Sequence, residues 1–291
     1  MKQGWLIVNG YLESEKFDEI YSWLIDAAEK NDCKLRKLTN DQVLSALPVN
    51  PGDTDWKSEP DFIIFWDKDV RLAYMLEEEG FEVFNSADAI EICDDKARTY
   101  IELQGLDVAT PKTFVAPLTF DDKYSDYTFL MQVEQHLGYP MVIKETKGSF
   151  GEQVYLVNNF EEAKECIDKI GTCDFIMQEY IESSKGRDIR LQVVGDKVVT
   201  AMERTNENDF RANVTNGGVM KPYTPTKKQE KIALEVCEQL GADFAGVDIL
   251  FGENEDLLCE VNSNAHFKNI YDCTGVNVAE AIIEHILKEI D

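Results

Sequence analysis

The chain has 291 residues, of which 44% are hydrophobic, and a formal net charge of −27 at pH 7. This length suits two or three small lobes that share a substantial core. The acidic charge argues against nucleic acid as a partner, because binding to a phosphate backbone needs clustered cations. No apolar run approaches the roughly 18 residues of a membrane span, so a membrane is not an expected partner either.

The cysteine and histidine patterns indicate a reducing compartment and argue against zinc. The seven cysteines form no CxxC pair, and residues such as Cys237 and Cys259 lie in apolar patterns typical of buried reduced thiols. The three histidines form no HxxxH pattern, which argues against a zinc site. The N-terminal residues read as a first strand and not as a signal peptide. We therefore expect a cytoplasmic protein.

Residues 1–85 alternate between strand and helix patterns. A Pro-, Gly- and Asp-rich stretch at 48–60 predicts a loop. The remaining pattern predicts strands at 4–9, 34–38, 61–66 and 81–84, and helices at 15–30 and 70–79. Alternation of this kind favours a small α/β domain with a parallel sheet.

Two further units follow in the chain. For residues 86–184 the pattern predicts helices at 87–104 and 160–170 and strands at 141–145, 153–157 and 175–181. For residues 185–291 it predicts strands at 188–194 and 197–203, a polar loop at 206–223, a helix around 232–240, an acidic hairpin at 244–264 and a last helix at 278–290. Apolar residues at helical spacing mark the faces of these last two helices that turn toward the core.

The acidic hairpin carries three polar residues within apolar strands. Glu260 and Asn262 are two apart and therefore point to the same face of one strand. A hairpin can bring Asp248 beside them. Two carboxylates and an amide oxygen suit a hard cation such as magnesium, especially one that phosphates also hold. The alternative is a partly exposed hairpin edge with solvated acids.

A glycine-containing loop follows an apolar strand that ends in Lys144. The loop contains Gly148, Ser149 and Gly151, and glycines of this kind let backbone N–H groups turn toward an anion. Lys144 could then contact phosphates as a point charge. The alternative is an ordinary hairpin with an exposed lysine. The loop is not a Walker A motif, because no GK[ST] opens a helix.

The strand predicted at 175–181 runs into a linker that could bind a nucleoside. Its backbone N–H and C=O groups could meet a purine edge, and Asp188 could accept hydrogen bonds from ribose hydroxyls. A plain interdomain connection is equally compatible with this segment. Four arginines lie close together in the sequence, at Arg187, Arg190, Arg204 and Arg211. The planar guanidinium of arginine can bind phosphate or carboxylate through two hydrogen bonds. For any single one of them, we expect instead an ion pair with one of the abundant glutamates on the surface.

The order of these motifs resembles that of the ATP-grasp carboxylate–amine ligases, and most closely the RimK-like branch that adds glutamate to a carboxyl terminus. The likeness runs from about residue 85 to the C-terminus. It implies an ATP-grasp fold of α/β and α+β class. The expected domains are an N-terminal parallel-sheet α/β domain at 1–85, a central ATP-grasp lobe at 86–184, and a C-terminal lobe with the metal site at 185–291.

The resemblance implies roles for individual residues, with ATP and two magnesium ions (or manganese) as cofactors. Lys96, Lys144 and Ser149 would contact phosphates. Arg211 and Asn213 would lie near the terminal phosphate and the acyl-phosphate, and Lys144 and Arg211 would act in catalysis. The remaining implied positions are the adenine hinge at Gln178, Glu179, Tyr180 and Ile181, the ribose contact Asp188, and the metal ligands Asp248, Glu260 and Asn262.

The implied reaction joins a carboxylate acceptor to an amino acid, with glutamate expected as the amine. The acceptor would be a protein C-terminus, a peptide or a cofactor, and the assembly a homodimer or homotetramer. The alternatives are a short-peptide or cofactor-tailoring ligase that uses another amino acid, and a non-catalytic ATP-binding regulatory module. The family follows its EVN triplet with a small residue, Ser, Pro and Gly, whereas this chain has residues 263–267, SNAHF. We therefore expect a different amine-side pocket.

Overall fold

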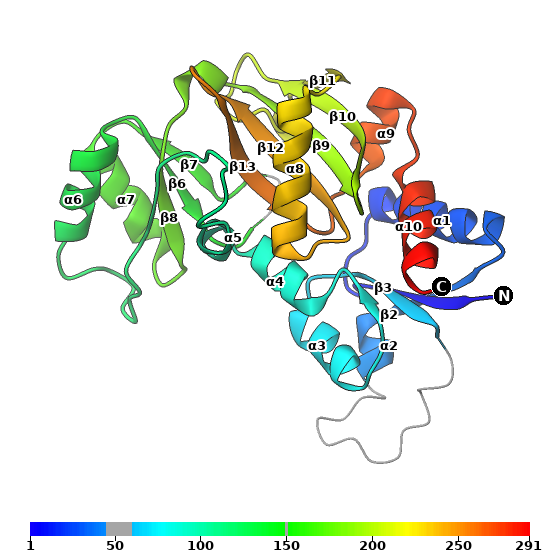
Figure 1. The fold of residues 1–291 in the computed structure, drawn as a ribbon. Helices are drawn as coiled ribbons and strands as arrows, with labels where there is room; N and C mark the ends of the chain where they lie inside the picture. Colours follow the sequence, from blue (N-terminus) through cyan, green and yellow to red (C-terminus); the bar gives the residue numbers. More distant parts are fainter. Residues whose placement is uncertain (45–59, 149–150) are drawn as a thin grey trace.

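A computed structural model describes residues 1–44, 60–148 and 151–291 of the chain. Nearly all of the predicted loop at 48–60, and Ser149 of the glycine-containing loop, lie outside the described residues. The described residues form three sheets with helices packed around them (Figure 1). No helix within these ranges is long and apolar enough to cross a membrane.

The N-terminal sheet has the predicted parallel arrangement, in the order β2-β1-β3-β4. All five residues of β3 are buried, as expected for a strand of a parallel sheet that is covered on both faces. The elements of this region are β1 (Gln3–Val8), α1 (Glu15–Lys30), β2 (Lys34–Thr39), α2 (Asn40–Leu44), β3 (Phe62–Trp66), α3 (Val70–Glu78) and β4 (Val83–Phe84).

A pair of short helices, α4 (Ala87–Asp94) and α5 (Lys96–Glu102), replaces the single helix predicted at 87–104. The break lies at Asp95, whose carboxylate accepts hydrogen bonds from the backbone N–H groups of Ala97 and Arg98 at 2.9 and 3.1 Å. A capping aspartate satisfies donors at the start of a new helix, so the helix predicted from periodicity alone is wrong at this point. The break places Lys96 on the first turn of α5.

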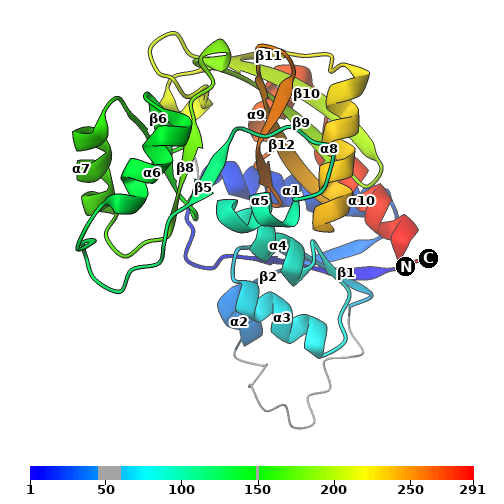
Figure 2. The ribbon, with the colours of Figure 1, turned by 60° about the vertical axis from the view of Figure 1, so that its left-hand side comes forward.

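The central sheet is antiparallel, in the order β5-β8-β6-β7. Helices α6 and α7 cover one face of it, and their apolar residues share a core with β6 and β8 (Figure 2). The sequence pattern does not predict β5 or α6. The elements are β5 (Thr113–Val115), α6 (Thr128–Leu137), β6 (Met141–Glu145), β7 (Val154–Val157), α7 (Phe160–Ile170) and β8 (Phe175–Glu179).

The third sheet is also antiparallel, in the order β11-β10-β9-β12-β13. Its residue ranges are η2 (Glu182–Ser184), β9 (Arg187–Val194), β10 (Lys197–Thr205), η3 (Val214–Asn216), β11 (Val219–Pro222), α8 (Lys227–Leu240), β12 (Phe244–Phe251), β13 (Asp256–Asn262), α9 (Lys268–Thr274) and α10 (Val278–Glu289). Strand β11 and the turn η3 lie within the stretch predicted as a polar loop, so that prediction is wrong for these residues. The helix α9 is not predicted either.

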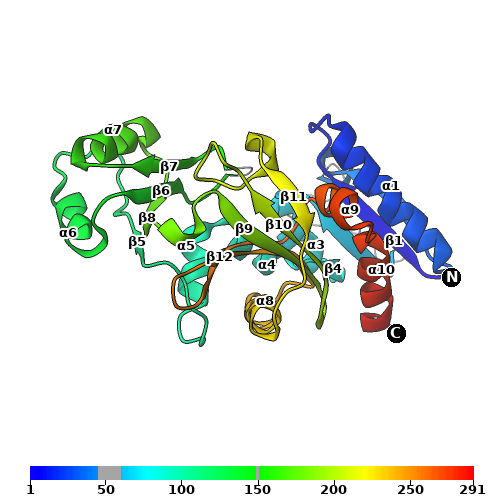
Figure 3. The same cartoon turned by 90° about the horizontal axis from the view of Figure 1, so that it is seen from above.

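The third sheet and the N-terminal sheet share one hydrophobic core. Helix α10 packs beside α1 (Figure 3), and the cluster around them includes Leu6 of β1, Phe244 of β12 and Ile282 of α10. The chain therefore returns at its end to the unit in which it began. The division into domains at 1–85, 86–184 and 185–291 stays a prediction.

Asn85, which is fully buried directly after β4, links the same two sheets through hydrogen bonds. Its Nδ2 donates to the carbonyl oxygens of Phe244 and Ser263, at 2.9 Å each, and its Oδ1 accepts from the backbone N–H of Phe244 at 3.1 Å. One amide side chain thus satisfies three backbone groups of the third sheet and its following turn.

We expect Asn85→Ala to lower the free energy of unfolding by about 3 kcal/mol, because it leaves three buried backbone groups without a partner. Urea denaturation followed by circular dichroism measures the change. The matched control is Asn158→Ala, since Asn158 is exposed and its hydrogen bonds within the described part of the chain go to Glu162. Equal effects of the two substitutions would show that the Asn85 link does not hold the sheets together.

Candidate active site

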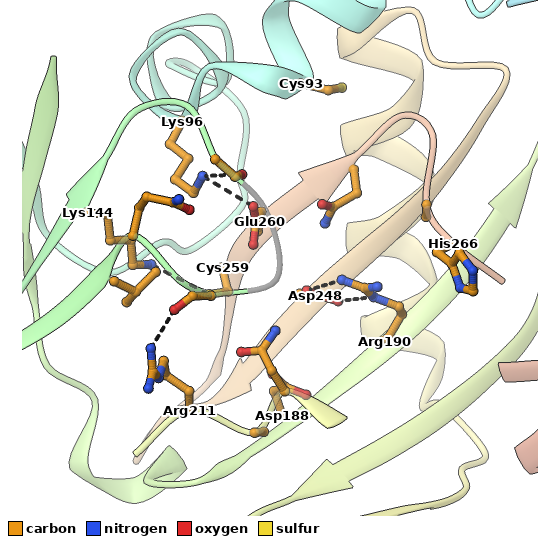
Figure 4. Close-up of a pocket in the computed structure, with 18 of the residues that line it drawn as sticks. Cys93, Lys96, Lys144, Asp188, Arg190, Arg211, Asp248, Cys259, Glu260 and His266 are labelled. Carbon is orange, nitrogen blue, oxygen red and sulfur yellow. Dashed lines mark hydrogen bonds and ion pairs between the residues drawn. The ribbon is translucent and has the colours of Figure 1, made fainter. Parts of the chain in front are cut away.

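One cavity of about 560 Å³ lies where the three sheets meet. Figure 4 shows Lys96 and Lys144 on one side of it, Asp248 and Arg190 on the other, and Glu260 between them. Most of the residues singled out in the sequence line this cavity. They are Lys96, Lys144, Gln178, Glu179, Tyr180, Ile181, Asp188, Arg211, Asn213, Asp248, Glu260 and Asn262.

The floor of the cavity is a group of two aspartates and two arginines on β9, β10 and β12. Strand register places Asp248 opposite Arg190 and Arg204 opposite Asp188. Arg190 donates to both oxygens of Asp248, at 2.6 and 2.7 Å, and Arg204 donates to both oxygens of Asp188, at 2.7 and 2.8 Å. Arg204 also reaches Asp248 at 3.0 Å. We call these four residues the buried quartet.

The two carboxylates of the buried quartet have different proton affinities. Burial disfavours the Asp248 charge, but Arg190 and Arg204 together lower the pKa of Asp248 below its usual value. Burial raises the pKa of Asp188, and the neighbouring Asp248 charge adds to this effect, whereas Arg204 opposes it. The two aspartates also raise the pKa of the Arg204 guanidinium despite its burial. The quartet is therefore charge-balanced when all four groups are ionised.

A β-bulge sets the residues on the neighbouring strand. Asp248 lies opposite Glu260, but Ile249 lies opposite Leu258, so Cys259 is an extra residue in β13. A bulge of this kind re-aims side chains, and both Cys259 and Glu260 line the cavity. Glu260 lies 3.5 Å from the Lys96 ammonium group. The hairpin thus brings Asp248, Glu260 and Asn262 to one wall.

The oxygen donors of this wall fit a magnesium ion that phosphates also hold. Among the described residues, no three or more His, Cys, Asp or Glu side chains cluster to form a complete metal site. Two carboxylates and one amide oxygen therefore need further oxygen ligands, which magnesium commonly takes from substrate phosphates. Both oxygens of Asp248 already accept hydrogen bonds from arginines, so a cation would share this carboxylate with the quartet.

Lys144 is buried at the opposite wall, contrary to the alternative of an exposed lysine. Its ammonium group donates to the Gln178 side chain at 2.7 Å, and Gln178 in turn donates to Thr113 at 2.8 Å. Cys259 lies 3.9 Å from the same ammonium group, and burial raises the pKa of this thiol to about 11. The thiol is therefore protonated at neutral pH.

Arg211 connects the polar loop to the glycine-containing loop. Asp209 holds its guanidinium at 2.7 and 3.0 Å and raises the pKa of Arg211, while Arg211 donates to the Gly151 carbonyl at 2.5 Å. Gly151 has a φ of +73°, and a Cβ there would lie 2.8 Å from the Asn213 oxygen. Only glycine suits both the backbone angle and this close approach.

Several cavity residues have roles that the sequence patterns do not predict. Arg190 and Arg204 pair with aspartates in the interior, so the expectation of surface pairing with glutamates is wrong for both. Asp188 faces Arg204, and its contact with ribose stays a prediction. A further group, at the end of the cavity beside the N-terminal sheet, comprises Asn9, Asp67, Asn264 and His266.

A family model for the RimK-like ATP-grasp domain matches residues 93–286. The chain belongs to the RimK-like ATP-grasp family. The predicted family resemblance is thereby confirmed, and with it the assignment as an ATP-dependent ligase of carboxylate and amine. ATP is the nucleotide of this family.

The alignments of this RimK-like ligase with its relatives include most of its residues. Uncharacterized protein MG012 of Mycoplasma genitalium is 31% identical over 229 residues, which are 77% of this chain and 79% of the relative. Ribosomal protein bS6--L-glutamate ligase of Escherichia fergusonii is 36% identical over 212 residues, which are 71% and 68% of the two chains.

A solved structure supports the fold of this RimK-like ligase. D-alanine--D-alanine ligase from Bacillus anthracis, complexed with ATP, has a TM-score of 0.76 at 17% identity. The superposition covers 100% of this chain and 99% of that one. The predicted ATP-grasp fold class is confirmed.

We expect Arg204→Met to lower the free energy of unfolding by about 3–5 kcal/mol, because it leaves a buried carboxylate without its partner. Guanidinium denaturation followed by fluorescence measures the change. Arg98→Met is the matched control, since Arg98 pairs with Glu91 and Glu102 on a half-exposed surface, where such pairs contribute about 0–1 kcal/mol. A loss for Arg204→Met no larger than that of the control would contradict a structural role for the quartet.

Proposed function

We propose that this ligase adds L-glutamate to a carboxylate of a protein or peptide. The observation that carries the proposal is the composition of the cavity, where the cations Lys96, Lys144 and Arg211 face the acidic wall of Asp248 and Glu260. Cations together with a metal neutralise a transferring phosphoryl group without a protein nucleophile. The relative from Escherichia fergusonii, named as a glutamate ligase for ribosomal protein bS6, supports glutamate and a protein acceptor.

The cavity residues would divide between nucleotide and reacting groups. Lys96 and Lys144 would bind phosphates, Asp188 the ribose, and the segment Gln178, Glu179, Tyr180 and Ile181 the adenine. Asp248, Glu260 and Asn262 would hold magnesium, or manganese, as two ions bound with ATP. The metal would supply charge neutralisation at the phosphates. Ser149 would add a phosphate contact, and it lies outside the described residues.

The proposed reaction proceeds in two steps. An oxygen of the acceptor carboxylate attacks the γ-phosphorus of ATP, and ADP leaves with the electrons of the broken P–O bond. The ammonium group of the amino acid first loses a proton to water, and the neutral nitrogen then attacks the acyl carbon. Loss of a second proton to water and departure of inorganic phosphate give the amide. Arg211, with Asn213 beside it, would stabilise the oxyanion that forms in the second step, because a guanidinium donates two directed hydrogen bonds.

We propose the cytoplasm as the site of this reaction. All seven cysteines are free thiols, as expected in a reducing compartment. A homodimer or homotetramer stays a prediction.

The proposed substrates are tested by incubating the purified chain with ATP, magnesium, single amino acids and a cell extract. We expect ADP release with L-glutamate, and mass spectrometry should find a protein or peptide heavier by one or more glutamyl residues. Release with another amino acid instead of glutamate would favour a short-peptide or cofactor-tailoring ligase. ATP binding without release for any pair would favour a regulatory module.

We expect Glu260→Gln to lower the rate of ADP release by about 100-fold or more, because it removes a charge from the wall that would hold the metal. A coupled ADP assay at saturating magnesium measures the rate. The matched control is Glu255→Gln, which alters an exposed acid in the turn of the same hairpin. Glu255 forms an ion pair with Lys228. Turnover of Glu260→Gln close to that of the control would exclude Glu260 as a metal ligand.

A further inference from the structure

The cavity has a second end, built by the N-terminal sheet and the turn after β13. Asn9 follows β1 and Asp67 follows β3, so both lie at the carboxyl edge of a parallel sheet, where ligands commonly bind. Asn264 and His266 meet them from the third sheet. Figure 4 shows His266 on the far side of Asp248 and Arg190 from Lys96, Lys144 and Arg211, the cations proposed to bind phosphates.

Asp67 is a buried carboxylate without a cationic partner among residues 1–44, 60–148 and 151–291. The residue is 8% exposed, and it accepts hydrogen bonds from the Asn9 amide at 3.1 and 3.4 Å and from the Lys68 backbone at 2.7 Å. Among the described residues no Lys, Arg or His side chain forms an ion pair with it. Burial accordingly raises the pKa of Asp67. A buried carboxylate is costly unless a cation compensates its charge.

Asn264 adds an acceptor that has no donor. Its Nδ2 donates to the backbone carbonyl of Asp67 at 2.9 Å, which fixes the orientation of the amide. Its Oδ1 is buried and receives no hydrogen bond from any described residue. A buried acceptor of this kind indicates a ligand donor or a water at the same place.

His266 presents a further acceptor at this end. Its Nε2 lies 3.3 Å from the carbonyl oxygen of Lys16, which can only accept, so Nε2 carries the proton and Nδ1 has a free lone pair. Burial lowers the pKa of His266, so the ring is neutral at pH 7. Phe17 packs edge-on against the ring, with centroids 5.0 Å apart, and holds it in this orientation.

We propose that Asp67, Asn264 and His266 form a subsite for the ammonium group of the incoming amino acid. An ammonium group has three N–H donors, a positive charge and no acceptor. The three residues offer one charged and two neutral acceptors. Within the described ranges no ion pair of Asp67 with Lys, Arg or His is found, whereas Lys16, Arg190 and Lys268 lie near enough to His266 to help lower its pKa. An ammonium group therefore supplies the hydrogen-bond donors and the positive charge that Asp67, Asn264 and His266 would accept.

The position of the subsite indicates that it binds the attacking amine and not the carboxylate substrate. Asn264 follows Asn262 by two residues, and Asn262 belongs to the wall proposed to hold magnesium and the terminal phosphate. An amine bound beside Asn264 lies next to the place where the acyl-phosphate would form. Asp67 is thus a positioning and specificity residue, and this inference rests on the proposed ligase function.

The test compares binding of L-glutamate and of glutarate, the same dicarboxylate without an amino group. Isothermal titration calorimetry uses the full chain loaded with magnesium and a non-hydrolysable ATP analogue. We expect the wild type to bind L-glutamate about tenfold or more tightly than glutarate, since hydrogen bonds to a charged group have at least this effect on affinity. Asp67→Asn should bring the ratio of the two affinities close to one.

The matched control is Asp61→Asn, which removes one negative charge just before the opposite end of β3, where Asp61 is exposed. It should retain the wild-type preference. A preference retained in Asp67→Asn, or absent from the wild type, would overturn the ammonium subsite. If the mass-spectrometric assay identifies an amino acid other than glutamate, that amino acid and its deamino analogue replace the pair. The proposal of glutamate as the amino acid and the proposal of the ammonium subsite can therefore be contradicted independently of each other.

Discussion

The buried quartet of Asp188, Arg190, Arg204 and Asp248 is the interaction on which the rest of the site depends. It joins three adjacent strands of the third sheet at the floor of the cavity. Each charge is compensated by a neighbour opposite it in the strand register, so the floor can be ionic without a net charge. Other charged side chains of the cavity, such as Lys96 and Lys144, can then act on ligands, because the charges of the quartet already balance one another.

The quartet also decides how the acidic wall can bind a cation. Asp248 belongs to both, since its oxygens accept from two arginines while its strand neighbour Glu260 faces Lys96. A cation at this wall would compete with guanidinium groups for one carboxylate and with an ammonium group for the other. Phosphate oxygens would ease that competition, because they would attract the lysine and supply ligands of their own.

Local patterns in the sequence predict the hairpin but not its partners. The spacing of Glu260 and Asn262 places both on one face because side chains of a strand alternate. The bulge at Cys259 and the pairing of Arg204 with Asp188 depend on which strands become neighbours, and no local pattern contains that information. Strand β11 escapes prediction because it is a short edge strand that ends in Pro222. The break at Asp95 has a local cause instead, because the hydrogen bonds of one capping side chain end the helix that the periodicity predicts.

The residues after Asn262 matter because an amide-forming ligase must bind two chemically different substrates, an anionic acyl-phosphate and an amine, in one cavity. A phosphorylated carboxylate needs cations around it, whereas an amine needs acceptors that orient its nitrogen and receive hydrogen bonds from it. The cavity contains both kinds of group, with Lys96, Lys144 and Arg211 as the cations proposed for the phosphates and Asp67 as the carboxylate proposed for the amine. Asn264 and His266, which belong to the segment 263–267, line the same cavity as Asp67. We therefore expect a change in that segment to alter the choice of amine more than the binding of phosphate.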